Sequence, residues 1–199
     1  MTKSIKRICV FASASIELDE VYYSAAKELG KLIGQNNYDL VYGGSHRGLM
    51  YATAKAAKEN GSKIYAVMPQ KMVDVGFANP EDCEEFYITE GMRERKAKID
   101  SISDAVIAVA GGFGTLEEIS EMIVQKQLGY SNKPTVLLNT NHFYDNLLRF
   151  FDDVIVNGFA GASINDAVYV ANTPEEAINH IINYKPIHIE SRLTEHLCK

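Results

Sequence analysis

The chain alternates between short apolar runs and stretches in which apolar residues recur every three or four positions. Short apolar runs are typical of buried strands, and the longer periodic stretches are typical of amphipathic helices. We therefore predict strands at residues 5–11, 39–42, 63–68, 105–109, 135–138 and 167–170. The predicted helices occupy residues 21–33, 49–59, 92–101, 115–128, 144–155 and 174–183.

Strands and helices that alternate in this way form a parallel sheet with helices on both faces. We therefore expect an α/β fold with a doubly wound sheet, in which ligands bind beyond the carboxyl ends of the strands. The segment 70–86 has weak periodicity and is predicted to be a loop with at most one helical turn. We expect a single domain over residues 1–185 and a C-terminal tail over residues 186–199.

Composition narrows the classes of function. The 199 residues are 46% hydrophobic and 23% charged, as in an ordinary globular domain. The net charge of −6 lacks the basic excess of duplex-binding proteins, so we expect no nucleic-acid partner. No run approaches the roughly 20 apolar residues of a membrane span, and the first apolar run is too short for a signal peptide.

The cysteines and histidines argue against a metal or disulfide scaffold. The three cysteines are an odd number without a C-x-x-C pair, which fits a reducing, cytoplasmic environment. The five histidines are scattered and form no H-E-x-x-H motif. We therefore expect no metal site and no cofactor.

Glycine-bearing turns follow two predicted strands. The glycines are Gly43, Gly44 and Gly48 in the first turn and Gly111, Gly112 and Gly114 in the second. Such turns let the backbone approach a ligand, and the helix that follows directs free N–H groups at an anion. The alternative is that the glycines only make tight turns. Two such turns in one sheet favour a phosphate ligand, although neither matches the dinucleotide fingerprint or the P-loop.

Two further features lie next to the second turn. Met92, Arg95 and Ile99 share one helical stripe, so we expect Arg95 to point toward the top of the sheet, whereas Arg93 and Lys98 look solvated. Thr115 and Glu118 have the spacing of a capping box, which would explain Glu118 as a structural residue. The functional alternative is that Glu118 faces the bound ligand. Thr173 and Glu176 repeat the box without any sign of chemistry.

The motifs together resemble those of the LONELY GUY (LOG) family of cytokinin riboside 5′-monophosphate phosphoribohydrolases. The segment 111–118 resembles the family motif PGGxGTxxE, and the segment 92–96 resembles its MHxRK stretch. The turn at 43–50 resembles the GGGxxGLMG loop, and Gln127-Leu128-Gly129 with Lys133-Pro134 also matches. The similarity extends over roughly residues 8–182, most of the chain.

The resemblance implies a function and a set of site residues. It implies a Rossmann-like homodimer that cleaves the N-glycosidic bond of a nucleoside 5′-monophosphate, either a prenylated adenosine monophosphate or AMP. Arg95 and Glu118 match the positions that the family uses for catalysis. The implied substrate- and phosphate-binding residues are Gly43, Gly44, Met92, Lys96, Gly111, Gly112, Gly114 and Thr115. The helices at 92–101 and 115–129 are the expected dimer interface, supported by Met122 and Tyr130 as apolar residues for burial between subunits.

The chain also departs from the family pattern. Ala110 replaces the motif proline and Arg93 the usual histidine, while Ser13, Ser45 and Tyr51 replace glycines. We expect these changes to line the nucleotide end of the site and to bear on base specificity. A non-catalytic nucleotide or cofactor carrier is therefore the alternative. The lysine decarboxylase label attached to the family would need pyridoxal phosphate on a lysine, and no lysine has a sequence context that suggests it.

Overall fold

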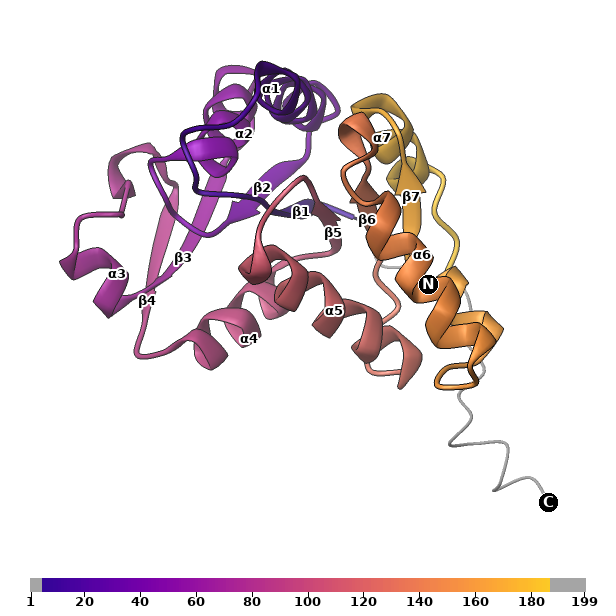
Figure 1. The fold of residues 1–199 in the computed structure, drawn as a ribbon. Coiled ribbons are helices and arrows are strands. Elements are labelled where there is room, and N and C mark those ends of the chain that lie inside the picture. Colours follow the sequence, from indigo (N-terminus) through magenta and orange to yellow (C-terminus); the bar gives the residue numbers. More distant parts are fainter. Residues whose placement is uncertain (1–4, 187–199) are drawn as a thin grey trace.

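The computed structural model describes residues 5–186, apart from the side chains of residues 163 and 164, and contains one seven-stranded parallel sheet (Figure 1). The strand order is β4-β3-β2-β1-β5-β6-β7. The strands are β1 (Arg7–Phe11), β2 (Asp39–Tyr42), β3 (Ile64–Pro69), β4 (Glu85–Thr89), β5 (Ala105–Ala108), β6 (Thr135–Leu138) and β7 (Tyr169–Ala171). This arrangement confirms the predicted α/β class and places a topological switch between β1 and β5.

Helices cover both faces of the sheet. One face packs against α1 (Glu20–Gln35), α2 (Gly48–Glu59) and α7 (Pro174–Ile182). The other face packs against α4 (Met92–Ile102), α5 (Phe113–Gln127) and α6 (Asp145–Val156). The short elements are α3 (Gln70–Asp74) and three 3₁₀ helices at Pro80–Asp82, Thr140–His142 and Ala162–Ala167. No helix among residues 5–186 is both long enough and apolar enough to cross a membrane.

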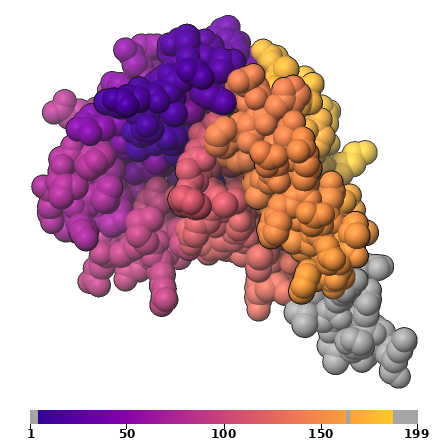
Figure 2. All heavy atoms as spheres, in the orientation of Figure 1, coloured from indigo at the N-terminus to yellow at the C-terminus, as the bar shows by residue number. Residues whose placement is uncertain are grey.

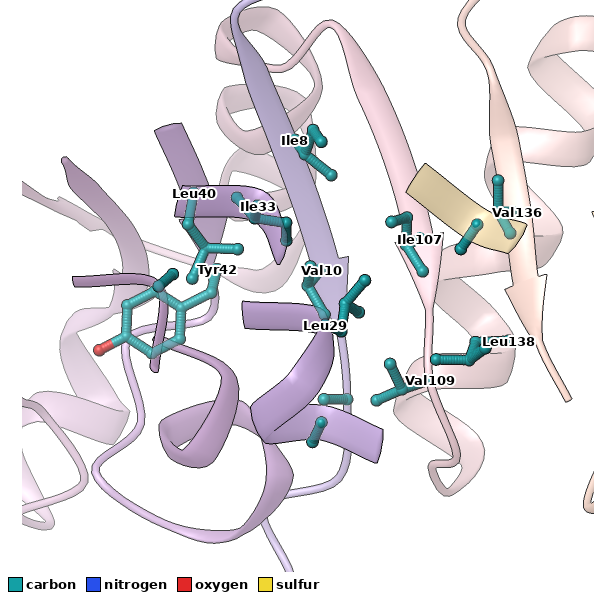
Figure 3. Packing of buried hydrophobic residues seen from close by; sticks show 14 of the residues in the cluster. Ile8, Val10, Leu29, Ile33, Leu40, Tyr42, Ile107, Val109, Val136 and Leu138 are labelled. Atoms are coloured by element: carbon teal, nitrogen blue, oxygen red, sulfur yellow. The ribbon is translucent and has the colours of Figure 1, made fainter. Parts of the chain in front are cut away.

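The apolar runs form strands because both faces of the sheet are buried. Side chains alternate between faces along a strand. Ile8 and Val10 of β1 therefore join the core under α1 (Figure 3), whereas Cys9 and Phe11 join the opposite core. A strand that is buried on both faces reads as a continuous apolar run rather than as an alternating one.

The sequence prediction missed strand β4, because it assigned the segment 70–86 to a loop. It lies at the edge of the sheet, and none of its side chains is fully buried. The main chain of β4 pairs with β3, from Tyr65 opposite Glu85 to Pro69 opposite Thr89. The apolar pattern of this segment is weak because the backbone hydrogen bonds of an edge strand hold it in the sheet even when its side chains are only partly buried. The domain boundary at residue 185 stays a prediction, and residues 187–199 of the expected tail lie outside the described residues.

Candidate active site

A cavity of about 330 Å³ lies beyond the carboxyl ends of β1, β2, β3 and β5. Its walls come from the segments that follow these strands and from the starts of α4 and α5. The indigo N-terminal segment and the pink segment around residue 110 adjoin on the face shown in Figure 2. The cavity thus lies at the switch point, where the fold class binds its ligands.

Arg95 and Glu118 form a buried ion pair in this cavity. Arg95 Nη1 lies 2.5 Å from Glu118 Oε1, and the two side chains are only 7% and 5% exposed. Arg95 Nε also donates a hydrogen bond of 3.1 Å to the carbonyl of Val67 at the end of β3. The prediction that Arg95 points toward the sheet is therefore confirmed, and the guanidinium is held from two sides.

Gly43 provides the space that the guanidinium occupies. A Cβ atom on Gly43 would lie 2.5 Å from Arg95 Nη2 and 3.1 Å from the Met50 sulfur. Any larger residue would push the guanidinium away from Glu118. The absence of a side chain at position 43, directly after β2, therefore leaves the room that the Arg95–Glu118 ion pair needs.

The start of α5 differs from the predicted capping box. The helix begins at Phe113 with Gly112 as its N-cap, so Thr115 lies inside the first turn and Glu118 in the second. The box prediction was wrong because the glycine turn starts the helix two residues earlier than the apolar pattern indicates. By contrast, the Thr173 hydroxyl accepts a hydrogen bond from the Glu176 amide and does cap α7.

The first turn of α5 is suited to an anion. Its N–H groups have no intrahelical acceptor, and the helix dipole favours negative charge there. Gly112 and Gly114 line the cavity, and a Cβ atom on either would meet nothing within 4 Å. Gly111 instead packs on Thr115, where a Cβ would lie 2.2 Å from the Thr115 hydroxyl.

The loop after β1 reaches the cavity across Gly48. Gly48 has a φ of +62°, and a Cβ there would lie 2.5 Å from the carbonyl oxygen of Ser15. The Met50 amide donates a 3.2 Å hydrogen bond to the carbonyl of Ser13. This close approach of α2 to the loop places Ser13 in the cavity wall.

The structure brings most of the predicted site residues together. Those that line the cavity are Gly43, Met92, Arg95, Gly112, Gly114, Thr115 and Glu118. Gly44, Lys96 and Gly111 are not among the lining residues. Lys96 instead forms ion pairs with Glu117 and Glu121 on α5. Met92, on the same helical stripe as the buried Arg95 and Ile99, lines the cavity but is 50% exposed.

One end of the cavity is apolar, and sequence reasoning did not find it. Its walls are formed by Met50, Met68, Pro69, Met72 and Phe77. Met72 and Phe77 come from the segment of weak periodicity, which carried no signal that its side chains turn inward. Ser13 and Ser45 line the cavity as expected. The expectation was wrong for Ala110, Arg93 and Tyr51, which are not among the lining residues, and Tyr51 lies in a separate surface hollow.

Burial dominates the ionisation of Glu118. It raises the pKa of this carboxyl above the usual range, and the charge and hydrogen bond of Arg95 oppose the rise. The result is a carboxylate with little water around it and one guanidinium partner, a better proton acceptor than an exposed glutamate. Residues 5–186 contain no cluster of three or more histidine, cysteine, aspartate or glutamate side chains arranged to hold a metal ion.

Comparison with known proteins gives consistent matches. A family model described as "possible lysine decarboxylase" matches residues 50–181. The probable cytokinin riboside 5′-monophosphate phosphoribohydrolase LOGL2 of Oryza sativa subsp. japonica is 38% identical over 92% of this chain and 75% of that protein. Cytokinin riboside 5′-monophosphate phosphoribohydrolase LOG3 of Arabidopsis thaliana is 36% identical over 100% of this chain and 91% of that protein.

Solved structures agree on the fold. The molybdenum cofactor carrier protein of Chlamydomonas reinhardtii matches with a TM-score of 0.67 and 24% identity. The match covers 90% of this chain and 97% of the carrier. The same fold therefore also occurs in a molybdenum cofactor carrier.

Proposed function

This chain belongs to the LOG family, the group that the matching family model describes as possible lysine decarboxylases, and we propose that it is a nucleoside 5′-monophosphate phosphoribohydrolase. The reaction is hydrolysis of the N-glycosidic bond, with free base and ribose 5-phosphate as products. The observation that carries the proposal is the buried Arg95–Glu118 pair, which lies in the same cavity as the anion-suited first turn of α5.

The first turn of α5 binds the 5′-phosphate in this mechanism. The N-cap Gly112 and the first-turn residues Gly114 and Thr115 line the cavity, and the glycines leave the approach to their backbone open. Glu118 lies one turn further along the same helix, so a ribose held by its phosphate extends toward the carboxylate. Binding energy from the phosphate thereby positions the bond that breaks.

Glu118 and Arg95 carry the chemistry. As the C1′–N bond breaks, positive charge builds on the ribose, by analogy with the oxocarbenium-like transition state of glycosidases. The Glu118 carboxylate stabilises that charge and accepts a proton from the water that adds to C1′. The base leaves with the bonding electron pair and takes up a proton from solvent, which balances the proton that Glu118 accepts and later releases. Arg95 holds the carboxylate in place and, through its charge, keeps it ionised.

The apolar end of the cavity receives the base. Its methionines and Phe77 offer polarizable surface to a purine ring or to an alkyl group on it. AMP and N6-isopentenyl-AMP are therefore the substrates to compare.

A product assay tests the proposal. The purified chain is incubated with AMP, N6-isopentenyl-AMP and adenosine, and ribose 5-phosphate and free base are quantified by chromatography. We expect equimolar base and ribose 5-phosphate from at least one nucleotide and far less base from adenosine. Nucleotide binding without any turnover would reject hydrolysis and favour a carrier, the alternative function.

We also propose that the protein is a cytoplasmic homodimer. Leu128 is 41% exposed and Tyr130 82% exposed near the end of α5, which supports this face as the interface. Met122 does not contribute to it, because it is buried within the subunit core, contrary to the expectation from the sequence. Light scattering at micromolar concentration tests the dimer, and a monomer would reject it.

A further inference from the structure

A second cavity, of about 280 Å³, lies at the far end of α5. It is lined by Lys126, Asn165, Asp166, Val168, Tyr169, His180, Asn183, Tyr184 and Lys185. Lys126 follows Glu118 by two helical turns, about 12 Å along the axis. This cavity therefore opens near the amino ends of the strands, away from the candidate active site.

Lys126 is buried in the wall of this cavity, with a relative exposure of 4%. Within residues 5–186, its amine makes no side-chain hydrogen bond and no ion pair. Its Nζ lies over the face of the Tyr184 ring, 5.0 Å from the ring centroid. An ammonium in such a place is poorly stabilised, because burial removes its hydrating water and the contact with a ring face replaces only part of the stabilisation that water gave.

The charged groups around Lys126 do not neutralise it. Asp166, on the 3₁₀ helix Ala162–Ala167 before β7, attracts the ammonium, whereas Lys185 adds a second positive charge to the cavity wall. Burial lowers the pKa of Lys126 to about 8, and the attraction of Asp166 opposes this only in part. The neutral, nucleophilic fraction of this amine near physiological pH is therefore much larger than that of an ordinary lysine.

A neutral imidazole faces the same cavity. The His180 ring stacks on Tyr169 with centroids 4.0 Å apart and planes 5° from parallel, which fixes its orientation. Burial lowers the pKa of His180, and the charge of Lys126 lowers it further. The cavity thus combines a nucleophilic amine, a group that can accept and return a proton, and space for a small molecule.

We propose that Lys126 is an imine-forming site for small aldehydes that carry a carboxylate or a phosphate. The neutral Nζ attacks the aldehyde carbon, His180 relays protons, and the carbinolamine loses water to leave a C=N bond. Lys185, at the cavity wall, attracts the anionic group. The reaction consumes one amine and one aldehyde, releases one water and requires no oxidant or reductant. It does not depend on the proposed hydrolysis.

The test is reductive trapping on the full chain. Glyoxylate or glyceraldehyde 3-phosphate is added at pH 7.5 with cyanoborohydride, which reduces the imine to a stable secondary amine, and each lysine is quantified by peptide mass spectrometry. Exposed Lys71 is the internal control. At this pH an amine of pKa 8 is about 24% neutral, and an ordinary lysine of pKa about 10.4 is about 0.1% neutral.

We expect Lys126 to be trapped at least about tenfold faster than Lys71, since part of the roughly 200-fold advantage in neutral amine is lost to burial and lower basicity. The rate at Lys126 should level off above about pH 8. Lys126→Arg should remove the label, and Lys185→Met should remove the preference for anionic aldehydes over neutral glycolaldehyde. Equal labelling of Lys126 and Lys71 in the wild-type chain would overturn the proposal. This comparison and the pH profile are both measured on the wild-type chain, so they do not depend on whether a variant folds.

Discussion

Removal of the guanidinium from the Arg95–Glu118 pair tests how strongly the two side chains depend on each other. Arg95→Met keeps most of the apolar stem and leaves the Glu118 carboxylate in a site that is 5% exposed. Breaking a buried ion pair from one side costs about 3–5 kcal/mol, because the remaining charge has no partner. The carbonyl of Val67 also loses its donor.

The loss should depend on pH. Burial already raises the pKa of Glu118, and Arg95→Met removes the group that opposes this rise. A carboxyl whose folded pKa lies above its unfolded value of about 4.3 binds more protons when folded, so stability falls as pH rises between the two values. The variant should therefore be least destabilised near pH 5 and most destabilised at pH 8.

Urea unfolding, followed by circular dichroism, measures the effect. The wild type, Arg95→Met, Glu118→Met and the double variant are compared at pH 5 and pH 8. We expect the double variant to recover most of the loss at pH 8, since two apolar side chains can replace a buried pair at little cost. If Arg95→Met loses equal stability at both pH values, or if the double variant loses the sum of both single losses, the two residues are not coupled.

Three further changes have defined outcomes. Gly43→Ala should reduce turnover and also lower the melting temperature, because its Cβ displaces the guanidinium from its buried partner Glu118; kinetics and thermal unfolding measure the two effects. Gly48→Ala should destabilise the chain by more than about 1 kcal/mol in urea unfolding, because the residue has a positive φ and its new Cβ would lie 2.5 Å from a backbone oxygen. Gly76→Ala is the matched control, because Gly76 has a φ of +77° but open space around the position of a Cβ. Thr173→Ala should cost about 1 kcal/mol in the same assay, because it removes the cap of α7.

The strands were predictable wherever both of their faces are buried, because such strands have a continuous run of apolar residues. Five of the seven strands follow from such runs, the edge strand β7 follows from a short apolar run that is only partly buried, and the alternation with helices predicts that the sheet is parallel. The edge strand β4 was not predictable in this way, because its backbone pairing with β3 contributes to its stability and leaves no mark on the side chains.

The candidate site was predictable where local spacing decides the outcome. The stripe shared by Arg95 and Ile99 fixes both as inward-facing, and the glycine turns mark the helix starts. The capping box failed because local pattern could not tell a cap from a residue in the first turn. The apolar wall at Met72 and Phe77 depends on how a non-periodic segment folds back, which is a tertiary property.

Lys126 illustrates a different limit. A lysine in an amphipathic helix is normally solvated, so its sequence context gave no hint of burial. Its environment is made by α7 and the segment before β7, which lie about 40 to 60 residues further along the chain. Only the packing of these elements against α5 distinguishes it from the other lysines.

The most direct test of the proposed hydrolysis compares two neighbouring carboxylates on α5. Glu118 lies in the cavity, whereas Glu117 is 53% exposed and pairs with Lys96 outside it. Glutamine at either position keeps the shape and removes the charge. We expect Glu118→Gln to release ribose 5-phosphate from the best nucleotide about 10²-fold or more slowly while still binding it, because a positioned base contributes roughly 10²–10⁴-fold. Glu117→Gln should stay within about twofold of the wild type. A Glu118→Gln variant that hydrolyses the nucleotide at the wild-type rate would contradict the proposed mechanism.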